Sequence, residues 1–229
     1  MKRIFATVLA ASMMLAGTSA FAQISVGAGY LGSFQKLSAT NMDISKSVYM
    51  NGLYAGLENT FQFDANMGMS VGAYYVYSAA SASSMFDTLE LIDGFVKGRL
   101  DEHFINIPLN LVIGADIQQG LRGFFYAGPT VSCGLSSKVK ANVLDILKFN
   151  ASDNYKHNYF ERFDLLFGAG VGMDINSTVR IKAGFDYGLF NRIGDGLNIK
   201  DAQGNVKLAS SEKASLNRSQ ITVGVSYLF

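Results

Sequence analysis

Apolar and polar residues alternate with a period of two along much of the chain. The final stretch shows this most clearly. Ile221, Val223, Val225, Tyr227 and Phe229 occupy one register, and small or polar residues fill most of the positions between them. Such alternation is typical of a β-strand with one apolar face. The pattern therefore predicts a strand that runs to Phe229.

Seven earlier stretches have the same pattern, which gives eight predicted strands. They are Ile24–Leu31, Val48–Glu58, Met67–Ser78, Phe104–Gly114, Gly123–Leu135, Phe163–Ile175, Thr178–Leu189 and Arg218–Phe229. Each is close to the roughly 9–11 residues with which a tilted strand crosses a bilayer. After the first 22 residues no apolar run is long enough to predict a membrane-spanning helix.

Alternation alone does not say which face of the strands is buried. A soluble barrel buries its apolar register, whereas a membrane barrel turns it toward lipid. Three features favour the membrane barrel: glycine and charges of both signs in the polar registers, aromatic residues at the ends of the apolar registers, and alternation of short and long connections. The predicted fold is an all-β, eight-stranded antiparallel up-and-down transmembrane β-barrel.

This fold assigns the notable side chains to three groups. A neutralising charge network is predicted inside the barrel, with a selective channel as the alternative, although so narrow a barrel has little room for water. Its residues are Glu58, Asp164, Asp174, Arg180, Lys182 and Asp186. An aromatic girdle is predicted at Tyr30, Tyr75, Tyr77, Phe125, Phe163 and Tyr187. The last strand, through Ile221, Val223, Val225, Tyr227 and Phe229, resembles the C-terminal signal read by the barrel-assembly machinery.

The first 22 residues have the features of a cleaved signal peptide. Lys2 and Arg3 precede an apolar run, Ile4–Gly17, and a small-residue cleavage site at Ala20-Phe21-Ala22. The barrel domain is then residues 23–229. An even number of strands places both termini in the periplasm, beside the short connections Asn59–Asn66, Ala115–Arg122 and Asn176–Ser177. The long connections, expected outside the cell, are Gly32–Ser47, Ala79–His103, Ser136–Arg162 and Phe190–Asn217.

Composition narrows the range of functions. Lys and Arg total 19 against 18 for Asp and Glu, so no basic field favours nucleic acid. The single cysteine, Cys133, cannot form a disulfide within the chain and is expected to face lipid. The sequence GAGYLG (Gly27–Gly32) matches a dinucleotide-binding pattern but lies within a predicted strand, where packing explains it better. No catalytic, cofactor or metal site is predicted.

Two features of the long connections leave alternatives open. His103 and His157, the only histidines, are interpreted as solvated loop residues, with a lipid A-modifying enzyme as the alternative. The apolar segments Ser84–Gly98 and Val139–Phe149 fit either a short helix or an extension of a strand above the membrane. Such segments mark partner surfaces when they are exposed.

Four motifs resemble the PorT-like outer-membrane β-barrel domain, often labelled "porin family" and found mostly in the Gram-negative Bacteroidota. The chain has an Ile-Pro-Leu strand at Ile107–Leu109, a Gly-Pro strand at Gly128-Pro129, and a Phe-Asp strand with Gly168, Gly170 and Gly172. A Tyr-Gly-Leu-Phe-Asn sequence follows at Tyr187–Asn191, with shorter spacing than the family often has. The resemblance implies an outer-membrane barrel and permits a role in a secretion apparatus.

The function expected from the sequence is structural or interactive and involves no catalysis. The barrel would present surface loops or act as a subunit of an envelope assembly. The expected partners are outer-membrane lipid, the barrel-assembly machinery during biogenesis, and an envelope protein bound through the extracellular loops. The alternatives are a porin-like channel for small solutes or ions, and a lipid A-modifying enzyme that uses loop His and Ser residues.

Overall fold

The computed structural model is all-β and describes residues 22–39, 44–81, 96–143, 147–152, 161–193, 198–200, 206–209 and 214–229. Its strands are β1 (Ala22–Ala39), β2 (Ile44–Gln62), β3 (Met67–Ser81), β4 (Val96–Gln118), β5 (Leu121–Val143), β6 (Leu147–Ser152), β7 (Phe163–Ile175), β8 (Val179–Gly188), β9 (Asn198–Lys200), β10 (Val206–Ala209) and β11 (Ala214–Leu228). Within these ranges, no helix has the length and apolar character needed to span a membrane.

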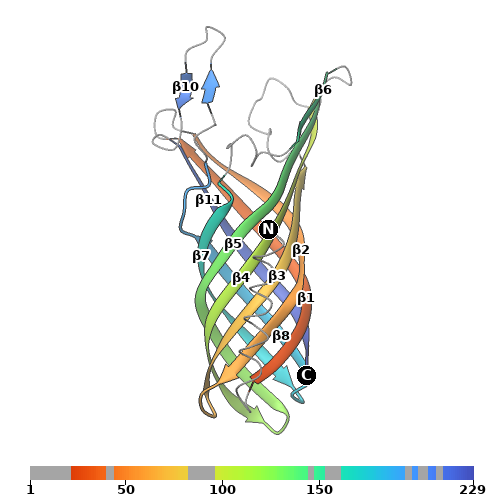
Figure 1. Cartoon of the computed structure of the whole chain (residues 1–229), viewed down its shortest axis with the longest axis vertical. Helices are drawn as coiled ribbons and strands as arrows, with labels where there is room; N and C mark the ends of the chain where they lie inside the picture. Colours follow the sequence, from red (N-terminus) through yellow and green to blue (C-terminus); the bar gives the residue numbers. More distant parts are fainter. Residues whose placement is uncertain are drawn as a thin grey trace, which may run out of the picture.

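Eight of the strands form a closed antiparallel barrel (Figure 1). Their order around the wall is β4-β3-β2-β1-β11-β8-β7-β5, and β5 pairs back with β4. The first and last strands meet along their lengths, from Ser25 opposite Leu228 to Ala39 opposite Ala214. Closure satisfies the backbone hydrogen bonds of the wall internally, which a bilayer requires. The predicted eight-stranded barrel is confirmed.

The apolar register of the wall faces outward and the polar register faces inward. On β11, the outward side chains from Ile221 to Phe229 have exposed fractions of 43% to 74%, whereas inward Gln220 is 3% exposed. On the other strands, buried serine, threonine, asparagine and charged residues likewise occupy the inward register. A soluble barrel has the opposite arrangement. The outward apolar surface therefore fits lipid.

Three tight turns lie at one end of the barrel, which is also the end of β11 (Figure 1). In the turn between β2 and β3, the Asp64 carboxylate accepts hydrogen bonds from the backbone N–H groups of Asn66 and Met67, both at 2.7 Å. The β4–β5 turn contains Gly120 with φ of 78°, a left-handed conformation that glycine adopts without strain. This end is called the short-turn end below.

At the opposite end, called the mouth, the strands are longer than the sequence predicted. β1 and β2 stay paired up to Ala39 opposite Ile44, so the prediction of a loop over Gly32–Ser47 is wrong for most of that range. The period-two pattern did not reveal this hairpin because its residues are mostly polar. Strand residues beyond the lipid need no apolar face. β4 and β5 each run for 23 residues, and β6 adds to β5 above the barrel (Figure 1).

The two apolar loop segments are strands wherever the structure describes them. The segment Val139–Phe149 is divided between the end of β5 and the start of β6, and residues 96–98 begin β4. Residues 84–95, His157 and the predicted signal peptide up to residue 21 lie outside the described residues. β9 and β10 form a separate two-stranded sheet on the mouth side of the barrel (Figure 1).

Candidate functional site

Four of the six residues predicted for the interior network form one cluster near the short-turn end, called the base cluster. They are Glu58, Asp174, Arg180 and Lys182. Arg180 donates two hydrogen bonds to the carboxylate of Asp174, directly opposite on the neighbouring strand, at 2.7 and 2.9 Å. The Lys182 ammonium contacts both carboxylate oxygens of Glu58, at 2.8 and 3.0 Å. Arg180 also lies 3.5 Å from Glu58, which joins the two pairs.

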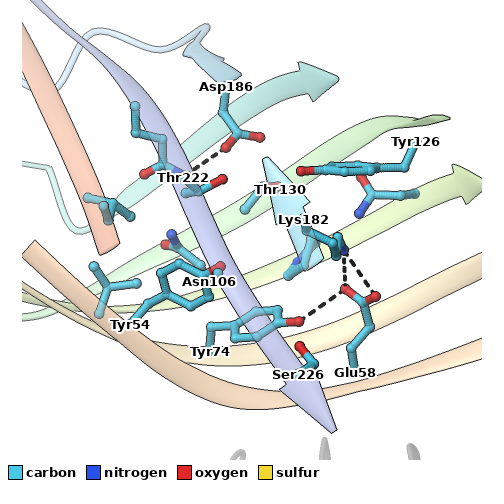
Figure 2. Close-up of a pocket in the computed structure, with 16 residues that line it drawn as sticks. Tyr54, Glu58, Tyr74, Asn106, Tyr126, Thr130, Lys182, Asp186, Thr222 and Ser226 are labelled. Atoms are coloured by element: carbon cyan, nitrogen blue, oxygen red, sulfur yellow. Dashed lines mark hydrogen bonds and ion pairs between the residues drawn. The ribbon is translucent and has the colours of Figure 1, made fainter. Parts of the chain in front are cut away.

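Rings from other strands surround the base cluster. The Arg180 guanidinium lies 4.9 Å from the centre of the Phe124 ring, and the Lys182 ammonium lies 4.3 Å from that of Tyr126. Tyr74 donates a hydrogen bond of 3.1 Å to Glu58 (Figure 2). Buried charges are stable only when paired and hydrogen-bonded, and this arrangement provides both.

A second cluster fills the barrel near the mouth and is called the mouth cluster. It consists of Gln35, Glu102, Asp164, Arg192 and Arg218. The carboxylate of Glu102 accepts hydrogen bonds from Gln35 at 2.6 Å and from Arg192 at 3.1 Å. Asp164, predicted for the same network as Glu58, lies here instead and pairs with Arg218 at 3.4 Å. Both arginines stack on Phe104, at 5.2 and 4.4 Å from its centre.

Arg192 reaches the mouth cluster from a segment without regular structure. After β8 the chain turns inward, so that Arg192 and Ile193 are 1% and 3% exposed. The side-chain oxygen of Asn191 accepts hydrogen bonds from the backbone N–H groups of Ile193 at 3.1 Å and Leu216 at 2.9 Å. The Arg192 backbone N–H also binds the carbonyl of Leu216, at 2.9 Å. These bonds hold the segment across the barrel mouth.

A cavity of about 70 Å³, lined by both polar and apolar side chains, lies between the two clusters (Figure 2). Glu58 and Lys182 of the base cluster border it, as do Leu31 and Val76, which pack on Phe104 under the mouth cluster. Asp186, the sixth predicted network residue, lines this cavity and accepts a hydrogen bond from Gln220 at 2.9 Å. The volume suits a few small molecules such as water.

Five aromatic rings point into the barrel, and the sequence analysis gave none of them a role. Each lies directly opposite a glycine on a neighbouring strand. The pairs are Tyr54 with Gly29, Tyr74 with Gly56, Phe104 with Gly134, Phe124 with Gly172 and Tyr126 with Gly170. A Cβ atom at position 29 would lie 2.7 Å from the Tyr54 ring, so the ring fits only because residue 29 is a glycine. The sequence could have identified these rings, because they are aromatic residues in the polar register at positions that pair with glycines.

The predicted girdle residues all lie on the outer surface. Tyr30, Tyr75, Tyr77, Phe163 and Tyr187 are on the mouth half of their strands, and Phe125 is near the short-turn end. The hydroxyl groups of three of these tyrosines have polar partners on the same face: Tyr30 with Tyr49 and Asn51, Tyr75 with His103, and Tyr77 with Asp101. An apolar ring with a hydrogen-bonded hydroxyl suits a membrane interface.

His103, considered for catalysis, lies on the outer wall and not in a loop pocket. Its Nδ1 atom forms a hydrogen bond of 2.6 Å with the Tyr75 hydroxyl, and its ring lies against Tyr75 and Tyr77. Ser136 is directly opposite on β5. Among the residues that the structure describes, no three His, Cys, Asp or Glu side chains come together as a metal site would require.

The closed wall, the lipid-facing apolar register and the ionic interior define a transmembrane β-barrel. The sequence matches the family model of the outer membrane protein beta-barrel domain over residues 18–194, and the chain belongs to that family. It is therefore an outer-membrane protein.

Among solved structures, the chain is similar to Ail of Yersinia pestis, with 12% identity, a TM-score of 0.43 and coverage of 91% of this chain and 99% of that one. OprG of Pseudomonas aeruginosa gives 12%, 0.40, 91% and 96%, and the outer membrane protease OmpT of Escherichia coli gives 10%, 0.42, 93% and 98%. These similarities are too distant to indicate a function. No curated protein matches the sequence at a significant level.

Proposed function

We propose that this protein is a closed, non-catalytic outer-membrane barrel with a structural or interactive role. It would hold strands and loops above the membrane, either as a surface protein or as a subunit of an envelope assembly. The mouth ends of β1, β2, β4 and β5, together with β6, are called the platform below. The observation that carries this proposal is the filled interior. One end of the cavity borders on the paired Glu58 and Lys182, and the other on Leu31 and Val76, which pack on the buried Phe104 ring. The cavity between them holds only about 70 Å³.

The strands beyond the girdle support the interactive part of the proposal. β1 continues from Tyr30 to Ala39, and the paired ends of β4 and β5 carry β6 as a third strand (Figure 1). Only the girdle-to-girdle part of each strand is needed to cross a bilayer, since about 9–11 residues suffice. The additional ordered sheet offers a surface to a partner.

Conductance in planar lipid bilayers tests the closed interior. The wild-type barrel should give no single-channel steps. The double variant Glu58→Ala with Lys182→Ala, which shortens two side chains bordering the cavity, should give small steps if the base cluster is what blocks water. An exposed-site control, Asp116→Ala, should stay silent. Regular conductance by the wild-type protein would favour the porin-like alternative, which the polar side chains among the cavity lining support.

Extraction from the native envelope tests the interactive role. A tagged barrel is extracted in mild detergent, and bound proteins are identified by mass spectrometry. A stoichiometric protein partner that is lost when the residues joining β5 and β6 are shortened would support a role in an envelope assembly. Recovery of the barrel with lipid alone would limit the proposal to a stand-alone structural protein.

A lipid A-modifying enzyme remains the second candidate because His103 lies on the wall that faces lipid, opposite Ser136. Its test is the mass of lipid A from cells that express the protein. A changed mass that reverts with His103→Ala, but not with the wall control Asn51→Ala, would establish the enzyme. An unchanged mass would support the non-catalytic role.

The narrower placement among PorT-like barrels of Bacteroidota rests on sequence motifs. One motif has a clear structural use, because Asn191 of the Tyr-Gly-Leu-Phe-Asn sequence ties the Arg192 segment to β11. The proposed topology, with a cleaved signal peptide and with the mouth outside the cell, is tested by protease treatment of intact cells. Cleavage should fall on the mouth side of the barrel and should spare the short turns.

A further inference from the structure

One carboxylate inside the barrel lacks the ion pair that the others have. In the described part of the chain, five carboxylates lie deep inside the wall. They are those of Glu58, Glu102, Asp164, Asp174 and Asp186. A buried carboxylate without an ion pair is costly in a medium of low dielectric constant, so a compensating positive charge is expected beside it.

The carboxylate without an ion pair is that of Asp186. The other four carboxylates each form a salt bridge with a basic group within 3.5 Å. The carboxylate of Asp186 has a neutral partner instead, the amide of Gln220. Lys182, the basic group that borders the same cavity, is already bonded to both oxygens of Glu58. Among the described residues, no basic group therefore forms a salt bridge with Asp186, which faces the cavity.

The Gln220 side chain gives an independent indication of a ligand. Its nitrogen donates to Asp186, which leaves its Oε1 oxygen as the free end of the amide. Among the described residues that oxygen has no hydrogen-bond partner, and Gln220 is only 3% exposed where it lines the cavity. Buried acceptors in native proteins are nearly always satisfied by protein, water or an ion. The Thr130 and Thr222 side chains line the same space (Figure 2).

We propose that the cavity binds a small monovalent cation of the sodium or potassium type, held by Asp186 and by the Oε1 oxygen of Gln220. Carboxylate, amide and hydroxyl oxygens are hard ligands that suit alkali and alkaline-earth ions. A single positive charge matches the one carboxylate of the site, whereas a divalent ion usually requires more than one. The cavity volume accommodates an ion with a few water molecules.

The test uses the purified full-length barrel in a neutral detergent, first in choline chloride at fixed ionic strength. Choline serves as the reference cation because its bulky quaternary ammonium cannot be coordinated by oxygen ligands at the short distances of an alkali ion. Replacing choline with sodium should raise the thermal unfolding midpoint in a saturable way, because a ligand that binds only the folded state stabilises it. It should also broaden the ²³Na resonance. Asp186→Asn should remove both effects, and Asp116→Asn, at an exposed carboxylate, should retain them.

Other outcomes would overturn the proposal. A wild-type midpoint that does not respond to sodium or potassium, or that responds equally in Asp186→Asn, removes the site. A response to acid alone in choline would show that a proton neutralises Asp186, and a response to magnesium without sodium would exclude a monovalent ion. If Asp186→Asn does not fold, Gln220→Met, which removes the amide oxygen, should shift the sodium titration at least tenfold to higher concentration. These results do not depend on whether the platform binds a partner.

Discussion

The base cluster and the mouth cluster both pair buried charges inside the barrel, but they use different parts of the chain. Every member of the base cluster projects from a regular strand of the wall: Glu58 from β2, Asp174 from β7, and Arg180 and Lys182 from β8. The mouth cluster instead depends on Arg192, which enters from a segment between strands. The wall strands alone position the base cluster. The mouth cluster also needs the segment that contains Arg192, which lies across the mouth.

This difference predicts unequal consequences when a charge is removed. A basic group on a central strand cannot leave the interior without disturbing the wall. Arg192 can move out to water if the few hydrogen bonds of its segment break. The base cluster should therefore respond to substitution as a rigid site, and the mouth cluster as one that relaxes.

Glu58→Ala should have the largest effect. It leaves Lys182 without a partner and removes one contact of Arg180, so the free energy of unfolding should fall by about 3–5 kcal/mol. Urea unfolding in lipid vesicles, followed by far-ultraviolet circular dichroism, measures the change. The exposed-site control Asp116→Ala should stay within about 0.5 kcal/mol of wild type. Equal losses for both variants would show that the cluster does not stabilise the fold.

Glu102→Ala in the mouth cluster should cost less, about 1–3 kcal/mol, because Arg192 can move to water. The same urea titration measures it. The double variant Glu102→Ala with Arg192→Ala should regain part of the loss. A cost as large as that of Glu58→Ala would contradict the distinction between a fixed and a relaxing cluster.

Asn191→Ala tests the tether of the Arg192 segment. The loss of two hydrogen bonds to backbone N–H groups should lower the stability by about 1 kcal/mol. Hydrogen exchange followed by mass spectrometry should show faster exchange in peptides that contain Ile193 and Leu216, with the base cluster strands unchanged. The wall variant Asn51→Ala serves as a control and should leave exchange at the mouth as it is in wild type.

Two adjacent tyrosines compare the inside of the wall with the outside, and the smallest effect is expected here. Tyr74→Phe removes a hydrogen bond to the buried Glu58 and should cost about 1 kcal/mol. Tyr75→Phe removes an exposed hydrogen bond to His103 and should change stability by less than about 0.5 kcal/mol. The reverse order of the two values would mean that the outer surface is more constrained than the interior.

The period-two pattern was sufficient to predict the wall and much of the base cluster. Glu58, Asp174, Arg180 and Lys182 are in the polar registers, so their inward direction follows once the apolar register faces lipid. The pattern could not show that Asp164 pairs with Arg218 and not with the base cluster, because the stagger between strands decides which inward residues meet.

Two other features were beyond the pattern for physical reasons. Arg192 has no register, since its segment belongs to no strand and is placed by Asn191 and by backbone bonds to Leu216. The extension of β1 and β2 to Ala39 and Ile44 is hidden because strands in water lose the apolar alternation that marks strands in lipid. The five rings opposite glycines, in contrast, were readable once the register was known.

The pairing of β1 with β11 has a consequence for the timing of assembly. The two strands that close the wall are separated by nearly the whole barrel sequence, so closure brings together residues as distant as Ser25 and Leu228. Contacts between such distant residues make folding slow. Until β11 arrives, β1 has an open edge that could pair with another chain. The pairing of β1 with β11 therefore forms only on a full-length barrel domain, and the wall becomes continuous only when the last strand has been delivered.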